Sequence, residues 1–342
     1  MVPSGSWSGN VGELLGAARA LVTPGLRAAV ATLPPAVERI AAHHFGWTDP
    51  AVGEHAWGKG VRSALVLACA RAVGGQESAA VPAAVAIELV HNASLIQDDL
   101  IDGDTVRRHR PAVWVEFGAP AAILVADAMF FASIRALHSG AVRDVGAATE
   151  VFVDAVQQLV AGELTDTSFE ARGEVSLAEC SAMTAAKTGA LLEAACVLGA
   201  HCGGADSDCS YQLGRFGHHL GVAFQAVDDY LGIWGASENT GKPVLADLRQ
   251  RKKSLPVVFA LTSDNPAAAE LASFYHGDGL LSEEQVERAA DLIERTGARE
   301  WVREYGRQEI DSALRYLSAA CSDTVGRDQL TVLAQLVRDR EA

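Results

Sequence analysis

Two short acidic runs are the residues of this chain best suited to chemistry. Residues 97–102 read Gln-Asp-Asp-Leu-Ile-Asp and residues 225–229 read Gln-Ala-Val-Asp-Asp, and each run lies in an otherwise apolar segment. On a helix, Asp98 and Asp102 share a face with Asp99 beside them. Like charges held together in apolar surroundings repel each other unless a cation lies among them. The five carboxylates of the two runs therefore predict bound metal.

Arginine residues follow the first acidic run directly. Asp102 is followed by Arg107, Arg108 and Arg110. A diphosphate with Mg²⁺ accounts for this order, because the metal bridges carboxylate and phosphate oxygens while guanidinium groups bind the phosphate oxygens that remain. The plainer alternative is a helix end held together by internal salt bridges. At this density of charge we favour the diphosphate.

Lysine is scarce, and its positions are informative. Of the 28 basic residues only five are lysine, namely Lys59, Lys187, Lys242, Lys252 and Lys253. An ammonium group is a compact point charge suited to phosphate oxygens. Chance or codon bias is the alternative for any single lysine, so the surrounding motif decides.

The bulk composition excludes several classes of partner. The chain has 342 residues, 49% of them apolar, and a net charge of −15, which argues against nucleic acid or an anionic membrane surface as its main partner. The six cysteines show no CxxC spacing and no zinc-type pairing with histidine, which favours reduced thiols in a cytoplasmic protein. Residues 1–10 lack the order of a secretion signal and are expected to form a flexible tail. The best candidate span, residues 117–134, carries Asp127, so we expect no stable membrane insertion.

Apolar residues recur at three- and four-residue intervals almost throughout, which predicts an all-α fold. Segments such as 83–96 and 191–200 are apolar on most sides, so we expect them to be buried centrally or in an oligomer. No linker is apparent, and residues 11–342 are expected to form one domain. The expected helices cover residues 11–31 with an interruption at Pro24, 35–44, 59–74, 80–102, 112–138, 143–163, 176–199, 209–234 and 254–264, with three more before the C-terminus.

The order of the motifs resembles that of the trans-isoprenyl diphosphate synthases, or polyprenyl synthetases. The first acidic run with Arg107 and Arg108 is similar to the DDxxD motif and arginine pair of that family, and residues 224–229 are similar to its second motif. The other matching blocks are Gly58-Lys59-Gly60-Val61-Arg62, Lys187-Thr188-Gly189, and a tail with Gly241-Lys242-Pro243, Asp247-Leu248 and residues 252–256. One DDxxD alone is a weak signal, whereas these blocks in the family's order are specific.

The resemblance implies a fold, an assembly and a set of site residues. The implied fold is a single-domain helical bundle around a deep central cavity, usually a homodimer, with the two acidic runs facing each other across the cavity mouth. The implied ligands of a three-metal Mg²⁺ site are Asp98, Asp99, Asp102, Asp228 and Asp229. The implied contacts of the allylic diphosphate are Arg107, Lys187, Gln225 and Lys242, with Thr188 near the ionising carbon. The implied contacts of isopentenyl diphosphate are Lys59, Arg62, His91 and Arg108. Apart from the resemblance, His91 would be interpreted as a core histidine, and Lys252 and Lys253 either close over the diphosphate or form a solvated charge run.

The implied reaction is condensation of isopentenyl diphosphate with dimethylallyl, geranyl or farnesyl diphosphate by ionisation, condensation and elimination. Metal and cationic side chains stabilise the departing diphosphate, while an apolar, water-poor cavity protects the allylic carbocation. No side-chain nucleophile is needed, and the chain has no Gly-x-Ser-x-Gly elbow. Catalysis is then mostly positioning and electrostatics.

Product length depends on side chains below the first acidic run. On a helix, Ala93 and Ser94 point from that run into the cavity, and both are small, which favours a C20 or similar product over C15. Phe130 and Phe131 on the next expected helix are candidates for a lower stop, with plain core packing as the alternative.

Three departures from the family pattern keep other functions open. Gly232 stands where many members have a third aspartate of the second motif, Gly60 replaces an arginine, and Ser63 replaces a proline. A terpene cyclase on the same fold, which ionises one substrate and needs no second, is the first alternative. The second alternative is a noncatalytic subunit of a heteromeric prenyl synthase, against which the five retained carboxylates argue.

Overall fold

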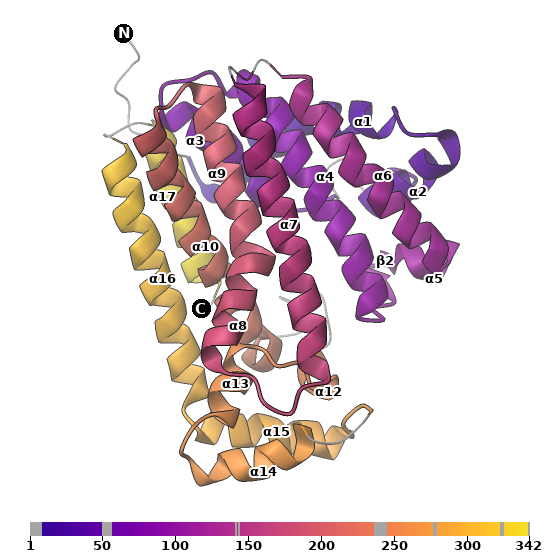
Figure 1. Ribbon diagram of the computed structural model, residues 1–342, viewed down its shortest axis with the longest axis vertical. Coiled ribbons are helices and arrows are strands. Elements are labelled where there is room, and N and C mark those ends of the chain that lie inside the picture. The colour runs from indigo at the N-terminus through magenta and orange to yellow at the C-terminus, as the bar shows by residue number, and fades with distance from the viewer. Residues whose placement is uncertain are drawn as a thin grey trace. The chain divides into compact units, whose positions relative to one another are not determined.

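The computed structural model describes residues 9–49, 57–140, 142, 144–235, 245–275, 279–321 and 325–340. The chain forms two compact units, each assembled from separate stretches of sequence. The first unit comprises Met1–Asp154, Leu192–Gly214 and Tyr316–Leu333, and the second comprises Ala155–Leu191, Arg215–Arg315 and Ala334–Ala342. Among the described residues both units are almost entirely helical (Figure 1), which confirms the all-α prediction. A single domain over residues 11–342 stays a prediction.

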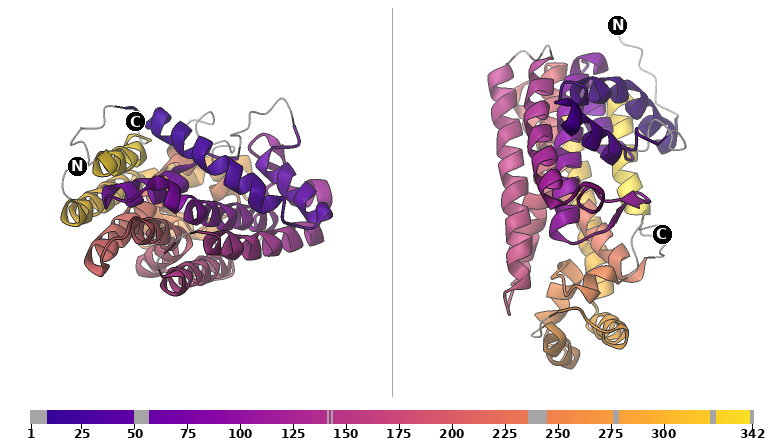
Figure 2. Two further views of the ribbon diagram at one scale, coloured as in Figure 1. Left: turned by 90° about the horizontal axis from the view of Figure 1, so that it is seen from above. Right: turned by 90° about the vertical axis from the view of Figure 1, so that its right-hand side faces the viewer.

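The first unit is organised around one apolar helix, α4 (Glu77–Ile101), which packs against α3 and α6 and also contacts α1. Figure 2 shows α4 and α6 side by side. Burial of α4 from Ala83 to Ile96 on most sides confirms the prediction made from its apolar surface. The other elements of this unit are α1 (Val11–Val30), α2 (Pro35–Phe45), α3 (Val61–Ala72), the strands β1 (Val106–Arg107) and β2 (Arg110–Pro111), α5 (Val113–Phe117) and α6 (Ala119–His138).

Helix α1 runs without a break, so the interruption expected at Pro24 is wrong. The helix begins with a capping box in which the Asn10 side chain accepts from the Glu13 amide and Glu13 accepts from the Asn10 amide. Val22 and Leu26 on either side of the proline are fully buried. Their packing outweighs the backbone hydrogen bond that Pro24 removes.

The segments that belong wholly to the second unit form several short helices, whose buried side chains make a hydrophobic cluster. These helices are α8 (Leu177–Thr184), the π-helical turn η1 (Ala185–Gly189), α12 (Ala246–Arg249), α13 (Leu255–Leu261), α14 (Pro266–Tyr275) and α15 (Glu283–Arg295). The cluster includes Leu248, Val257, Leu271, Val286 and Leu292, all fully buried. Among the described helices, five carry residues of both units, namely α7 (Val145–Glu170), α9 (Ala190–Gly203), α10 (Ser207–Trp234), α16 (Ala298–Ala320) and α17 (Val325–Asp339).

Several expected boundaries differ from those of the structure. The helix expected over residues 112–138 is two helices, because Gly118 adopts φ 88° and ψ 157°, a conformation available only to glycine. The helix expected over residues 176–199 is divided by the π-helical turn. The helix expected to end at residue 163 continues to Glu170. Within the described residues four helices, not three, follow residue 264.

Among the described residues, two helices are long and apolar enough to span a membrane by length and composition alone. Most of the apolar stretch of α4 is buried inside the protein, as expected of a core helix, whereas less than half of that of α6 is buried. The exposed face of α6 carries Ile123, Leu124 and Phe131. Exposed apolar surface of this kind is typical of a site of contact with another protein or with a membrane.

Candidate active site

The first acidic run lies at the C-terminal end of α4. Asp98 and Asp99 occupy its last turn, and Asp102 is the C-cap, whose amide donates to the Asp98 carbonyl at 2.8 Å. A helix C-terminus carries the negative end of the helix dipole, so carboxylates there are destabilising. No basic residue lies in the last turn of α4 to offset them. The placement therefore favours binding of a cation over stability of the helix.

A β-hairpin with a two-residue turn follows α4 and brings Arg107 back to this helix end. Strands β1 and β2 pair antiparallel, with Arg107 opposite Arg110, and the turn is formed by Arg108 and His109 with φ values of 50° and 63°. Positive φ at both turn residues matches a type I′ hairpin, although glycine and asparagine are the usual residues there. Sequence periodicity did not anticipate this hairpin.

Arg107 of the hairpin forms an ion pair with the buried Asp99. The Arg107 Nε donates to Asp99 Oδ1 at 2.8 Å, and its Nη2 contacts the same oxygen. Asp104 Oδ2 lies 3.8 Å from the same guanidinium. Burial lowers the pKa of Arg107, but the hydrogen bond and charge of Asp99 outweigh it, so the pKa lies above the ordinary value. Arg107, assigned to the diphosphate by resemblance, is thus next to a predicted metal ligand.

Arg108 points to a different side chain of α4. Both of its terminal nitrogens donate to Asn92 Oδ1 at 3.3 Å, and His44 Nε2 donates to the same oxygen at 3.1 Å. Burial lowers the pKa of Arg108 to about 10, and the neighbouring charge of Arg107 acts in the same direction. A Cβ atom on Gly58 would lie 3.3 Å from Arg108 Nη2. The segment that carries Lys59 therefore lies against this guanidinium.

Arg62 and His91 complete a group of cations and hydrogen-bond donors. Arg62 Nη1 of α3 donates to His91 Nε2 of α4 at 3.2 Å. Burial, followed by the charges of Arg62 and Arg108, holds the pKa of His91 well below 6.5, so the imidazole is neutral. We call Lys59, Arg62, His91 and Arg108 the basic cluster. Lys59 is the exposed member of the basic cluster.

Side chains on the same helices were predicted to set product length. Ala93 is fully buried and Ser94 is 8% exposed, and the Ser94 hydroxyl donates to the His91 carbonyl at 2.9 Å. On α6, Phe130 is partly buried, whereas Phe131 is 74% exposed. Phe131 therefore does not point into the interior of the first unit.

In the second unit, Lys187 and Thr188 lie in the π-helical turn η1. Lys187 Nζ lies 2.7 Å from Glu163 Oε2 and 2.7 Å from Asp166 Oδ2, both on α7. A Cβ atom on Gly162 would lie 2.5 Å from the Lys187 amide nitrogen, so only glycine allows α7 to approach this turn so closely. Single π-helical turns occur frequently at functional sites. Sequence reasoning missed Glu163 and Asp166, although two carboxylates three apart on one helix face were a visible signal.

A chain of hydrogen bonds runs from the π-helical turn to the second acidic run. The Thr188 hydroxyl donates to Gln225 Oε1 at 2.8 Å, and Gln225 Nε2 donates to Asp229 Oδ1 at 2.8 Å. The Leu255 amide donates to Asp229 Oδ2 at 3.0 Å. Burial raises the pKa of Asp229 to about 7 against the effect of these hydrogen bonds, and the charges of Asp247 and Asp228 raise it further.

The other aspartate of the second run pairs with a residue near the C-terminus. Arg340 Nη1 lies 2.9 Å from Asp228 Oδ1, and its guanidinium lies over the Phe224 ring at 4.7 Å from the centroid. No local pattern in the sequence points to this pairing. Lys242 lies outside the described residues, and the structure does not test its predicted role. Lys253 is buried, and its ammonium donates to the Phe169 carbonyl at 2.7 Å, so it is not part of a solvated charge run.

The two acidic runs offer carboxylate oxygens, which are the donors that Mg²⁺ and Ca²⁺ prefer. Within the described part of the chain no three histidine, cysteine or acidic side chains converge as a complete metal site. Mg²⁺ commonly uses one or two carboxylates, water and substrate phosphate in place of an all-protein cage. The helix-end position of Asp98 and the excess negative charge around Asp229 fit such a cation.

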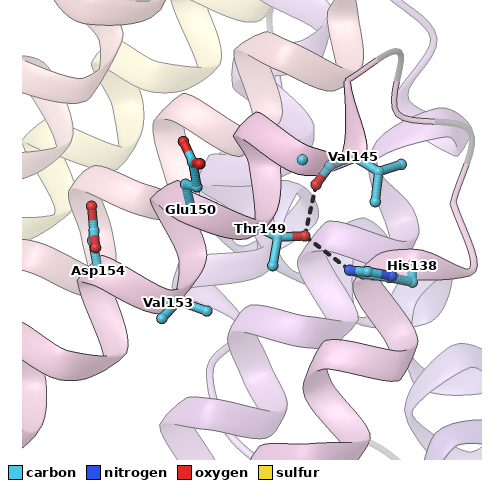
Figure 3. Close-up of a pocket in the computed structure, with 7 residues that line it drawn as sticks. His138, Val145, Thr149, Glu150, Val153 and Asp154 are labelled. Atoms are coloured by element: carbon cyan, nitrogen blue, oxygen red, sulfur yellow. Dashed lines mark hydrogen bonds between the residues drawn. The ribbon is translucent and has the colours of Figure 1, made fainter.

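A pocket of the first unit lies apart from all the predicted site residues. It has a volume of about 430 Å³ and is lined by His138, Val145, Gly146, Thr149, Glu150, Val153 and Asp154. His138 Nε2 lies 2.8 Å from the Thr149 hydroxyl, which donates to the Val145 carbonyl at 2.6 Å (Figure 3). These contacts tie the end of α6 to the start of α7 and bring no predicted ligand together.

Comparison with known proteins agrees with the geometry. The (2E,6E)-farnesyl diphosphate synthase of Mycobacterium tuberculosis is 38% identical over 96% of this chain and 93% of its own length. The geranylgeranyl diphosphate synthase of the same organism is 39% identical over 98% and 96%. The crystal structure of the polyprenyl synthetase from Streptomyces coelicolor superposes with a TM-score of 0.86 at 43% identity, covering 96% of this chain and 99% of that one. That of the polyprenyl synthase from Caulobacter crescentus, complexed with calcium and isoprenyl diphosphate, gives 0.86 at 28% identity, covering 99% and 100%.

The same family accounts for the residues that carry the candidate site. The family model of the polyprenyl synthetases matches residues 52–293. That range contains the basic cluster, both acidic runs and the π-helical turn with Lys187 and Thr188. By these matches and by its all-α isoprenoid synthase fold, the chain belongs to the polyprenyl synthetase family.

Proposed function

We propose that this chain is a Mg²⁺-dependent trans-prenyltransferase that condenses isopentenyl diphosphate with an allylic diphosphate. The observation that carries the proposal is the basic cluster beside the first acidic run. Arg62 contacts His91 at 3.2 Å, and Arg107 contacts Asp99 at 2.8 Å. Cations for one diphosphate and carboxylates for a metal therefore lie on α4 and on the elements that contact it. The relatives named above are prenyl diphosphate synthases, which supports this class of substrate.

The side chains of the two units suit two different diphosphates. In the first unit the basic cluster would hold isopentenyl diphosphate, and neutral His91 would donate or accept one hydrogen bond without adding charge. In the second unit Lys187 and Gln225 would contact the allylic diphosphate, with Thr188 near the ionising carbon. Glu163 and Asp166 orient the Lys187 ammonium before substrate arrives.

The chemistry requires charge stabilisation and exclusion of water, not a nucleophilic side chain. The carbon–oxygen bond of the allylic substrate breaks, the isopentenyl double bond attacks the resulting carbocation, and a proton leaves to the released diphosphate. Arginine and lysine side chains stabilise the leaving diphosphate. The buried apolar surface of α4 limits access of water to the carbocation.

The metal would be held by the two acidic runs. The proposed ligands are Asp98, Asp99 and Asp102 of the first run and Asp228 and Asp229 of the second, and the family pattern suggests three Mg²⁺ ions. Bound Mg²⁺ neutralises diphosphate charge and so makes it a better leaving group. The Caulobacter relative was crystallised with calcium and isoprenyl diphosphate, which supports a divalent cation at this fold.

A C20 product is the chain length that we propose. Ala93 and Ser94 are small and lie just over one helical turn before Asp98 on α4. Relatives of both names, farnesyl and geranylgeranyl diphosphate synthase, match this chain with nearly equal identity. Farnesyl diphosphate is therefore the competing product. A terpene cyclase remains the alternative reaction, because Gly60 and Gly232 depart from the family pattern.

A cytoplasmic homodimer is the proposed form of the enzyme. The dimer is supported by the exposed apolar face of α6, on which Ile123 is 48%, Leu124 64% and Phe131 74% exposed. A second copy of this chain would cover that face.

The deciding experiment incubates the purified chain with Mg²⁺ and farnesyl diphosphate, with and without isopentenyl diphosphate, and identifies products by mass. The expected result is a C20 diphosphate that forms only with isopentenyl diphosphate. Geranyl diphosphate as the primer distinguishes a synthase that stops at C15. Hydrocarbon or alcohol formed without isopentenyl diphosphate would indicate a cyclase instead.

A further inference from the structure

Arg19 of α1 occupies the space beside Gly60 at the start of α3. Gly60 is the N-cap of α3, with φ 72° and ψ 26°. A Cβ atom there would lie 2.8 Å from Arg19 Cγ, so no side chain fits at residue 60 while Arg19 keeps its place. The aliphatic stem of Arg19, from another helix, therefore occupies the space beside residue 60, where the family pattern has its own arginine.

The backbone around Lys59 is attached to α1 at two points. Arg19 Nη1 donates to the Lys59 carbonyl at 3.1 Å. The Trp57 indole donates to the Thr23 hydroxyl at 3.0 Å, and that hydroxyl donates to the Arg19 carbonyl at 2.7 Å. Trp57 is fully buried. The segment from Trp57 to Gly60 is thus held by one turn of α1.

The charge of Arg19 is not balanced by a carboxylate in the described part of the chain. Its Nε is buried and has no hydrogen-bond partner there. A partly buried cation without an anion costs stability. The same segment lies against Arg108 at Gly58. An anion bound at the basic cluster would balance this charge.

We propose that Arg19 is a binding residue for the diphosphate of isopentenyl diphosphate, acting beside Lys59. The proposal rests on the proposed function and adds to it a residue that lies before the range matched by the family model. Its charge adds to that of Lys59, and its hydrogen bond to the Lys59 carbonyl fixes the backbone of that residue.

The test compares Arg19→Gln and Arg19→Lys with Arg27→Gln. Arg27 lies on the same helix and stacks over Trp47 at 4.7 Å, so its replacement makes the same change of charge away from Lys59. Isopentenyl diphosphate cannot react without an allylic partner, so its binding can be measured alone by calorimetry. We expect Arg19→Gln to weaken this binding about tenfold, as for one charge-assisted hydrogen bond.

The kinetic pattern separates binding from a merely structural role. Arg19→Gln should raise KM for isopentenyl diphosphate by a similar factor and leave kcat and the KM for farnesyl diphosphate unchanged. Arg19→Lys should recover part of the affinity because it keeps the charge, and Arg27→Gln should behave as the wild type. Equal losses for both substrates, or no recovery by lysine, would reduce Arg19 to a structural clamp and overturn the proposal.

Failure of the proposed function gives a different result. If the wild-type chain neither binds isopentenyl diphosphate nor elongates farnesyl diphosphate, both proposals are wrong. If the wild type is active and Arg19→Gln binds isopentenyl diphosphate equally well, only the role of Arg19 is wrong. If Arg19→Gln does not fold, Arg19→Met replaces it, because methionine keeps an aliphatic stem beside Gly60 and removes the charge. An affinity and KM of Arg19→Met equal to those of the Arg27→Gln control would reject the role.

Discussion

The two acidic runs differ in how their charge is balanced. In the first run, Asp99 is fully buried and pairs with Arg107, which follows eight residues later along the chain. In the second run, Asp228 has a side chain 37% exposed and pairs with Arg340, near the C-terminus. Within the described part of the chain, Asp229 accepts hydrogen bonds from the neutral amide groups of Gln225 and Leu255, and burial raises its pKa to about 7. Asp99 of the first run is therefore buried with an arginine close to it in the sequence, whereas Asp229 of the second run is buried among neutral donors.

Because of this difference, we expect the two runs to contribute unequally to the stability of the protein even though both would bind cations. A buried ion pair is sensitive to loss of one partner, because the other is left charged and desolvated. A partly exposed pair is screened by water and contributes little. We therefore expect substitutions at the first run to affect folding more strongly, although both runs are needed for turnover.

The largest expected effect is on turnover and is shared by both runs. Asp98→Ala and Asp228→Ala should each lower kcat by about 10²- to 10³-fold, because each removes a carboxylate that would hold the metal. Product formation at saturating Mg²⁺ measures the loss, and calorimetric titration with Mn²⁺ tests metal binding independently. Asp311→Ala, at an exposed position of α16, is the control. An unchanged rate for Asp98→Ala would remove that residue from the site.

The next effect should distinguish the two runs by stability. Arg107→Ala leaves the carboxylate of Asp99 buried without its ion-pair partner, with the Asp99 side chain only 1% exposed. We expect a loss of about 3–5 kcal/mol in the free energy of unfolding by urea, measured in EDTA. The double variant Arg107→Ala and Asp99→Ala should recover part of the loss, since it removes the stranded charge. If Arg107→Ala lowered the free energy of unfolding by less than Arg340→Ala does, the second run would contribute more to stability than the first.

Local features of the first run were predictable from sequence. The apolar surface of residues 83–96 predicted a buried helix, and the four-residue spacing of Asp98 and Asp102 placed both near its end. The arginines directly after the run were expected to lie close to it. Such inferences succeed because helix periodicity and short connections restrict the partners to a few residues.

Contacts made by distant parts of the chain were not predictable. Arg340 reaches Asp228, and Arg19 lies beside Gly60, through tertiary packing that leaves no periodic signal. The π-helical turn at Lys187 and the hairpin turn at Arg108 also lack their usual sequence markers. In both turns the surrounding packing overrides local preference, as is common at functional sites.

Product length is the next comparison, because the runs differ in the residues that precede them. Ala93 and Ser94 precede Asp98 by five and four residues, whereas Ala223 and Phe224 hold these positions before Asp228. Ala93→Phe should shift the product toward C15 and cost about 1–3 kcal/mol, since Ala93 is fully buried. Ala223→Phe, at another fully buried alanine, should cost a similar amount without changing product length. Mass analysis of the products measures the shift, and an unmoved distribution in Ala93→Phe would show that this residue does not line the cavity.

The pH dependence of stability should have opposite signs in the two regions of metal-free protein. Burial, followed by the charge of Arg108 for His44 and of Arg62 for His91, depresses both pKa values. As pH falls below about 6.5 the unfolded chain gains protons that the folded one does not, so stability falls.

Asp229 has the reverse behaviour, because burial raises its pKa to about 7. Its contribution is fully present below the unfolded value of about 4 and is lost as pH rises to about 7. Each group changes the free energy of unfolding by at most about 1.4 kcal/mol per pH unit. Urea unfolding in EDTA should show the acid loss reduced in His91→Gln and the loss toward neutrality removed in Asp229→Asn. Parallel pH profiles for wild type and Asp229→Asn would contradict the assignment.

The smallest effect belongs to the exposed pair of the second run. Arg340→Ala removes the guanidinium that lies 2.9 Å from Asp228, and we expect a loss below about 1 kcal/mol because the Asp228 side chain is open to water. Arg338→Ala, also near the end of α17 and half exposed, controls for loss of charge at the C-terminus. Because Arg340 competes with a metal for Asp228, its removal should lower the Mg²⁺ concentration that gives half-maximal thermal stabilisation. A higher requirement for Mg²⁺ would mean that Arg340 assists metal binding, and the second run would then resemble the first in depending on its arginine.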